Sequence, residues 1–126
     1  MKLSILLVDD SKMMRKVIAK EVKEIFAGRD LSLTEAGSGN QALDRLRKDT
    51  FDIVFLDLTM PEVTGYDVLQ SVNKEGLKAN IIVLTADIQP EAEKRVRKLG
   101  AAGYVKKERP LNTAAMKEAL KGLKLL

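Results

Sequence analysis

Three carboxylates directly follow short apolar runs in a chain of 126 residues that contains no histidine and no cysteine. Asp9 and Asp10 follow the run from Leu3 to Val8, and Asp57 follows the run from Ile53 to Leu56. Without imidazole or thiolate, any chemistry must use carboxylates, hydroxyls and lysines. An oxygen-rich cluster of this kind suits a hard cation. Mg²⁺ is the natural candidate because it keeps several waters and seeks phosphate oxygens.

A hydroxyl and two amines follow two further apolar runs. Thr85 comes directly after the run that begins at Asn80, and Lys106 and Lys107 end the stretch that begins at Ala102. A carboxylate beside Mg²⁺ can attack an anionic phosphoryl donor and become an aspartyl phosphate. A nearby hydroxyl and ammonium would hold the remaining phosphoryl oxygens and spread the developing charge.

These runs are interpreted as buried parallel strands that alternate with helices. The run at 53–56 is apolar at every position, which is typical of a central strand covered on both faces. Strands are expected at 3–8, 31–35, 51–57, 80–84 and 102–106. Helices are expected between Ser11 and Gly28, around 42–46, and at 66–72, 90–99 and 111–125. The alternation predicts an α/β fold, a doubly wound five-stranded parallel sheet with five helices.

In a parallel sheet all strand carboxyl ends lie along one edge, which is where ligands bind. The polar residues above would therefore meet in one cleft. Taken singly, Asp9 and Asp10 could simply cap the first helix, and Thr85 could be a strand-end hydroxyl bonded to backbone. Their shared position at strand ends, together with Asp57, favours the metal site. Met13 and Met14 are expected in helix packing.

Charge and hydropathy narrow the function classes. The formal net charge is +4, the sequence pI is near 9.3, and 45% of the residues are hydrophobic. This mild charge permits acidic partners but does not indicate nucleic-acid binding. No apolar run is long enough to span a bilayer, and no signal peptide is evident. We expect one domain over residues 1–126, a cytoplasmic location, and neither nucleic-acid nor membrane partners.

Four motifs together resemble the receiver domains of two-component response regulators, and in length the single-domain chemotaxis-regulator type. In order they are Asp9-Asp10, Asp57-Leu58-Thr59-Met60-Pro61, Thr85-Ala86 and Gly103-Tyr104-Val105-Lys106-Lys107. The resemblance covers the whole chain and implies the flavodoxin-like strand order 2-1-3-4-5. It also implies a phosphorylated signalling switch with slow self-hydrolysis, rather than a dedicated enzyme.

Site roles follow from the resemblance, position by position. Asp57 would accept the phosphoryl group. Asp57 and Asp10 would ligate Mg²⁺ together with the backbone carbonyl of Thr59, and Asp9 would act mainly through water. Thr85 would be the switch hydroxyl that turns toward the phosphoryl group.

The fifth expected strand would supply an aromatic switch and a lysine. Tyr104 would be the aromatic whose rotation reports phosphorylation. The family places its lysine three residues after the tyrosine, at Lys107, whereas period-two alternation puts Lys106 on the same face as Tyr104. We choose Lys107. Glu108 stands where the family usually has proline, often after a cis bond. A cis bond before Glu108 would cost about 3 kcal/mol, so we predict a trans bond and a differently shaped loop.

The implied partners are a histidine kinase or histidine phosphotransfer protein, a downstream target, and a phosphatase. The target would bind noncovalently to the face of the fourth helix, fifth strand and fifth helix. Basic residues on this part of the chain are either solvated helix faces or a docking surface for an acidic partner. They are Lys94, Arg95, Arg97, Lys98, Lys106, Arg109, Lys117 and Lys121.

Two alternatives remain open. One is a pseudo-receiver that only binds partners, with Glu108 marking impaired phosphorylation. The other is a small Mg²⁺-dependent phosphatase of similar topology. Such a phosphatase would need a second acid two residues after the nucleophile, where this chain has Thr59.

Overall fold

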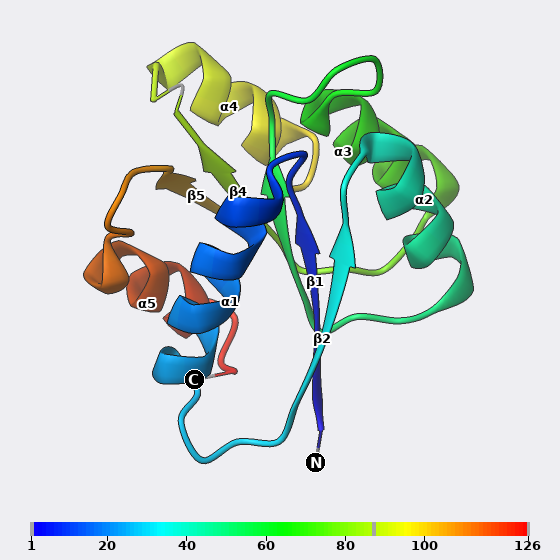
Figure 1. The fold of residues 1–126 in the computed structure, drawn as a ribbon. Helices are drawn as coiled ribbons and strands as arrows, with labels where there is room; N and C mark the ends of the chain where they lie inside the picture. Colours follow the sequence, from blue (N-terminus) through cyan, green and yellow to red (C-terminus); the bar gives the residue numbers. More distant parts are fainter. Residues whose placement is uncertain (1, 87, 126) are drawn as a thin grey trace.

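Five parallel strands form one sheet in the order β2-β1-β3-β4-β5 in the computed structural model, which describes residues 2–86 and 88–125 (Figure 1). The strands are β1 (Leu3–Val8), β2 (Leu31–Ala36), β3 (Ile53–Asp57), β4 (Ile81–Thr85) and β5 (Gly103–Lys106). The helices are α1 (Lys12–Ile25), α2 (Gly39–Lys48), α3 (Gly65–Glu75), α4 (Pro90–Lys98) and α5 (Thr113–Lys121). The predicted doubly wound α/β fold, with its strand order, is confirmed.

The helices cover both faces of the sheet, α1 and α5 on one side and α2, α3 and α4 on the other (Figure 1). Successive residues of a strand point to opposite faces, so the two hydrophobic clusters divide each strand between them. Along β1, Ile5 and Leu7 pack with α1 and α5, whereas Leu6 and Val8 pack with the other three helices. Every residue of β3 is buried, as expected for the central strand.

Helix ends follow local capping chemistry. Thr64 and Asp67 form a capping box at the start of α3, and Gly76 ends that helix with a φ of 67°. The last helix is shorter than the predicted 111–125: it begins after Asn112, whose side chain accepts a hydrogen bond from the Ala115 N–H, and ends at Lys121. Among the described residues, none of the helices combines the length and apolarity needed to cross a membrane.

One packing expectation is only half right. Met14 is buried in the cluster beneath α1, but Met13 is 61% exposed. The two are consecutive on a helix whose step is about 100° per residue, so only one of them lies on the face that meets the sheet. Met13 instead lies beside the loop that follows β5, where its sulfur accepts a hydrogen bond from Arg109.

Candidate functional site

The carboxyl edge of the sheet brings the predicted residues together. Within the described residues, the buried polar or charged side chains are Asp9, Asp57 and Thr85. Asp9 follows β1, Asp57 is the last residue of β3, and Thr85 is the last residue of β4. In the ladder, Asp57 is level with Leu84, and Thr85 is level with Lys106. Parallel pairing thus gathers side chains from three strands that are distant in sequence.

Lys107 supplies the ammonium of the site. Its Nζ lies 2.7 Å from Oδ2 of Asp9 and 3.3 Å from Oδ2 of Asp57. Its backbone N–H donates to the carbonyl of Thr85 at 2.7 Å, which continues the β4–β5 pairing past the strand end. The neighbouring Lys106 is exposed and pairs with Glu108 at 3.6 Å. The structure therefore places Lys107, and not Lys106, against the acids.

Three carboxylates form one cluster. Asp9, Asp10 and Asp57 each offer an oxygen, and these oxygens all lie within 4.8 Å of one another. Asp9 and Asp57 are buried, whereas Asp10 is exposed. Two backbone groups orient the buried acids: the Ser11 N–H donates to Asp9 at 2.9 Å, and the Thr59 N–H donates to Asp57 at 3.2 Å.

The electrostatics of the cluster are set by burial. Desolvation raises the pKa of Asp57 above its usual value, the charge of Lys107 opposes that shift, and the charge of Asp9 adds to it. For Lys107, burial alone would lower the pKa, but the hydrogen bond to Asp9 and the charges of both acids outweigh it, and the pKa is raised. Lys107 is therefore held as an ammonium against carboxylates that repel each other.

This donor set fits a hard divalent cation. It consists of carboxylate oxygens with no nitrogen or sulfur ligand, which suits Mg²⁺. Asp9 Oδ2 is buried against the ammonium of Lys107, whose Nζ lies 2.7 Å away. Among the described residues, Lys107 is the cation that forms ion pairs with acids of this cluster, so the cluster is short of positive charge, and a divalent ion would supply it.

The loop after β5 departs from the usual family sequence without displacing the lysine. The peptide bond before Glu108 is trans, as predicted, and the described residues have a cis bond at Arg109–Pro110. The pairing of Lys107 with Thr85 fixes the chain upstream of this loop. The altered segment therefore shapes the rim of the site.

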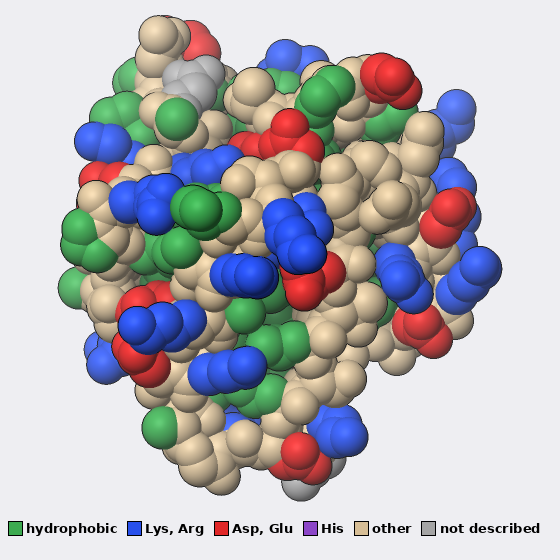
Figure 2. Space-filling model, in the orientation of Figure 1, with side chains coloured by type: hydrophobic (Ala, Val, Ile, Leu, Met, Phe, Trp, Pro, Cys, Tyr) green, Lys and Arg blue, Asp and Glu red, His purple; other side chains and the backbone are tan. Residues whose placement is uncertain are grey.

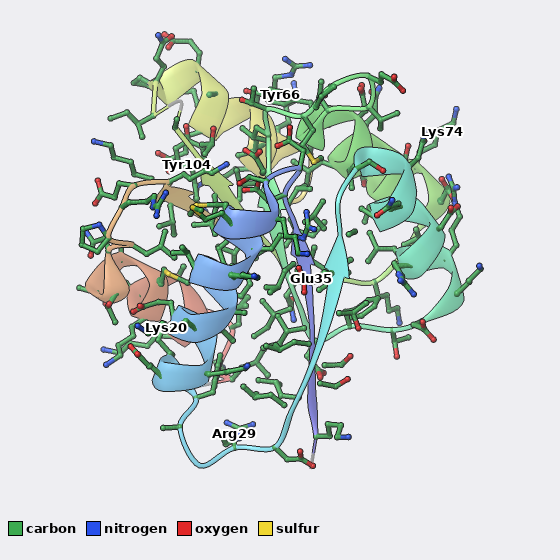
Figure 3. The ribbon with its side chains drawn as sticks, in the orientation of Figure 1. Lys20, Arg29, Glu35, Tyr66, Lys74 and Tyr104 are labelled. Carbon is green, nitrogen blue, oxygen red and sulfur yellow. The ribbon has the colours of Figure 1, made fainter. Side chains whose placement is uncertain are left out.

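Tyr104 lies on β5, three residues before Lys107. Figure 3 labels it beside β5, below α4. It is half-buried and packs against the cluster on the α2–α4 side. Its switching role stays a prediction.

Two positioning residues were missed from the sequence. Gly65 begins α3 directly behind the site: a Cβ there would lie 2.3 Å from the carbonyl oxygen of Asp57. Arg15 on α1 donates to the carbonyl of Asp9 at 2.7 Å and to Glu35 on β2 at 2.7 Å (Glu35 is labelled in Figure 3). A glycine directly after a helix-capping threonine was the available signal for Gly65. Nothing local marks Arg15, because its partners are reached only through the fold.

The chain belongs to the response regulator receiver domain family, whose model matches residues 5–121. Nitrate/nitrite response regulator protein NarP of Escherichia coli K12 is 31% identical over 104 residues, which are 82% of this chain and 47% of NarP. The chain therefore spans about half the length of that relative. Chemotaxis protein CheY of Halobacterium salinarum is 33% identical over 103 residues, 82% of either chain. The solved structure of chemotaxis protein CheY4 of Vibrio cholerae matches with a TM-score of 0.80 and 26% identity, covering 98% of this chain and 99% of that one.

Membership places the chain among phosphoacceptor signalling switches of two-component systems, with relatives that include chemotaxis proteins. Receiver domains generally bind Mg²⁺ at an acidic pocket, and the Asp cluster occupies the corresponding edge of this sheet. Histidine kinases and downstream targets are the general partners of the family.

Proposed function

We propose that this receiver accepts a phosphoryl group on Asp57 from a phosphohistidine of a partner kinase or phosphotransfer protein. The observation that carries the proposal is the position of Lys107, whose ammonium contacts both Asp9 and Asp57. The chain has no histidine, so the donor imidazole must come from the partner. The pairing of Lys107 with two site acids, despite Glu108 in the following position, favours this function over a pseudo-receiver.

The proposed step is a direct displacement at phosphorus. An oxygen of Asp57 attacks, the P–N bond to the donor histidine breaks, and its electron pair stays on the departing imidazole. Lys107 holds a phosphoryl oxygen and offsets the charge that develops, and the hydroxyl of Thr85 turns to hold another. The N–H of Thr59, which donates to Asp57 Oδ1, keeps the carboxylate oriented during the attack.

The residues that would hold Mg²⁺ are Asp10, Asp57 and the backbone carbonyl of Thr59, with Asp9 acting mainly through water. When bound, the ion would supply positive charge that screens the acids and attracts phosphoryl oxygens to the site. The exposure of Asp10 gives the ion an entry path from solvent.

The proposed output is a shift in the surface of α4, β5 and α5, with Thr85 and Tyr104 as the moving parts. The backbone carbonyl of Thr85 is bonded to the N–H of Lys107, so movement at Thr85 reaches β5 directly. Basic side chains on this surface, including Lys94 and Lys98, are exposed and would attract an acidic target. Water would later hydrolyse the acyl phosphate and reset the switch, and a phosphatase would be a further partner.

The test is phosphoryl uptake measured by intact-protein mass spectrometry. With acetyl phosphate and Mg²⁺, the parent should gain one phosphoryl group, and Asp57→Asn should gain none. Asp49→Asn, which removes an exposed acid outside the cluster, is the matched control and should behave as the parent. Chelation of Mg²⁺ should abolish uptake.

Three results would contradict the proposal. Equal uptake by Asp57→Asn would move the acceptor elsewhere. Lack of uptake by the parent, together with no Mg²⁺ binding in a titration, would support a binding-only pseudo-receiver. Catalytic turnover of a phosphomonoester would instead support a phosphatase.

A further inference from the structure

A cleft of about 380 Å³ opens beside the acid cluster. Its lining includes Asp57 and Lys107, and also Glu108 and Arg109 from the loop whose sequence departs from the family pattern. This loop therefore borders the space through which a phosphodonor must approach Asp57.

The charges lining the cleft are not equally engaged. Lys107 is paired with Asp9 and Asp57, and Glu108 is paired with Lys106 at 3.6 Å. Arg109, in contrast, is exposed and makes no ion pair with any described residue. It is the lining cation that remains available to an incoming anion.

Met13 explains how Arg109 is held there. The guanidinium Nη1 of Arg109 donates to the sulfur of Met13 at 3.6 Å, and Met13 is 61% exposed. A thioether is a weak, uncharged acceptor that is also flexible. The contact positions the guanidinium at the rim and does not neutralise its charge. A carboxylate oxygen is a stronger acceptor than the thioether and would displace it from the Arg109 N–H groups.

We propose that Arg109 recognises the leaving-group end of acyl phosphate donors, a role that rests on the function proposed above. In an acyl phosphate, Asp57 forms the new O–P bond while the bond from phosphorus to the acyl oxygen breaks, and the electron pair leaves with a carboxylate. The planar guanidinium suits that group, because it donates to the acyl oxygens of the donor and more strongly to the departing carboxylate. Phosphoramidate offers no such acceptor, since its nitrogen leaves as ammonia.

The test compares rate constants for phosphorylation of the Mg²⁺-loaded protein by acetyl phosphate and by phosphoramidate. Arg109→Gln should lower the acetyl phosphate rate relative to the phosphoramidate rate by about fivefold, which is about 1 kcal/mol at 1.36 kcal/mol per factor of ten. Arg109→Lys, which keeps the charge and loses the fork, should fall between the parent and Arg109→Gln.

Lys106→Gln is the matched control, because it removes one exposed cation three residues before Arg109. It should leave the ratio of the two rates unchanged. If Arg109→Gln lowers the rate constants for acetyl phosphate and phosphoramidate by the same factor, the effect is one of net charge and the proposal is overturned. The same holds if Lys106→Gln changes the ratio of the two rate constants as much as Arg109→Gln does. If all variants are phosphorylated with the parent's ratio of acetyl phosphate to phosphoramidate rate constants, only the role of Arg109 is overturned. If the parent takes up no phosphoryl group from either donor, the proposed function is overturned as well.

Discussion

The ion pairs of Lys107 at the acid cluster and of Arg47 on the surface have the same shortest distance, but the first is largely buried and the second is exposed. Lys107 Nζ lies 2.7 Å from Asp9, and its side chain is 22% exposed while that of Asp9 is 1% exposed. Arg47 Nη2 lies 2.7 Å from Glu75, linking α2 to α3 with side chains that are 47% and 36% exposed. A second contact of 2.9 Å, from Arg47 Nε, makes the surface pair bidentate. Figure 2 shows Lys and Arg side chains interspersed with Asp and Glu on the face in view.

The two regions shift acid pKa values in opposite directions. The pKa of Glu75 is lowered, chiefly by its hydrogen bond to Arg47. The pKa of Asp57 is raised although an ammonium lies 3.3 Å away, because desolvation outweighs the attraction. Distance alone therefore does not distinguish a structural pair from a functional one. Burial with an excess of like charges marks the site, since the fold holds those acids together at a cost.

Of the substitutions that test this contrast, Gly65→Ala should lower the free energy of unfolding the most. The added Cβ would meet backbone atoms, the Asp57 carbonyl oxygen at 2.3 Å and Leu58 Cα at 2.6 Å, and backbone at a helix start cannot move aside cheaply. We expect a loss of about 3 kcal/mol in the free energy of unfolding, measured with urea.

Gly122→Ala provides the control for that change. Gly122 has a helical φ of −60°, and an added Cβ there would meet its nearest atom at 3.4 Å. Its stability should equal or slightly exceed that of the parent. A Gly65→Ala protein as stable as Gly122→Ala would show that the turn behind Asp57 is looser than the structure indicates.

Lys107→Met should have the next largest effect. Removal of the ammonium leaves the buried carboxylates of Asp9 and Asp57 without their cation, and we expect a loss of about 2 kcal/mol, below the full cost for a completely buried pair because Lys107 is partly exposed. Added Mg²⁺ should recover part of the loss, because the ion would take over the compensation of the acids.

Urea unfolding in chelator and in Mg²⁺ checks this prediction, with Lys106→Met as the control that removes an exposed lysine. An equal loss in both variants, or a loss that Mg²⁺ does not reduce, would contradict the view that Lys107 compensates the buried acids.

Glu75→Gln should have the smallest effect, a small decrease of the urea midpoint at neutral pH, because both partners are exposed to solvent. The pKa of Glu75 is lowered in the folded chain, so the contribution of the pair is present above the ordinary pKa of glutamate and is lost as pH falls through the lowered value. Comparison of the urea midpoints of parent and variant at neutral and acidic pH checks both statements. A loss at neutral pH as large as that of Lys107→Met would remove the contrast between the two regions.

The sequence predicted much of the site because strand ends leave a local signature. An apolar run followed by an acid, as at Val8-Asp9 and Leu56-Asp57, gives both the strand and the edge at which the acid emerges. The choice of Lys107 over Lys106 also agrees with the structure, in which only the former contacts the acids. The bounds of α5 were less predictable, since apolar residues outside the helix, such as Leu111, are buried as well.

Other features were outside the reach of sequence patterns. Arg15 contacts the carbonyl of Asp9 and the side chain of Glu35, and neither contact follows from spacing along the chain. Met13 carries the same apolar signal as Met14 but lies exposed beside Arg109. Such contacts depend on how α1 is rotated and on where the loop after β5 passes.

By itself, the amino-acid sequence determined the alternation of strands and helices, the edge where the acids gather, and the lack of imidazole and thiolate side chains in this chain. Only the tertiary structure decided which lysine meets which carboxylate, how far each acid is desolvated, and which cation at the cleft has no anionic partner among residues 2–86 and 88–125. The physical reason is that periodicity and chain direction are local properties, whereas burial and charge pairing depend on atoms that distant segments bring within a few ångströms of one another.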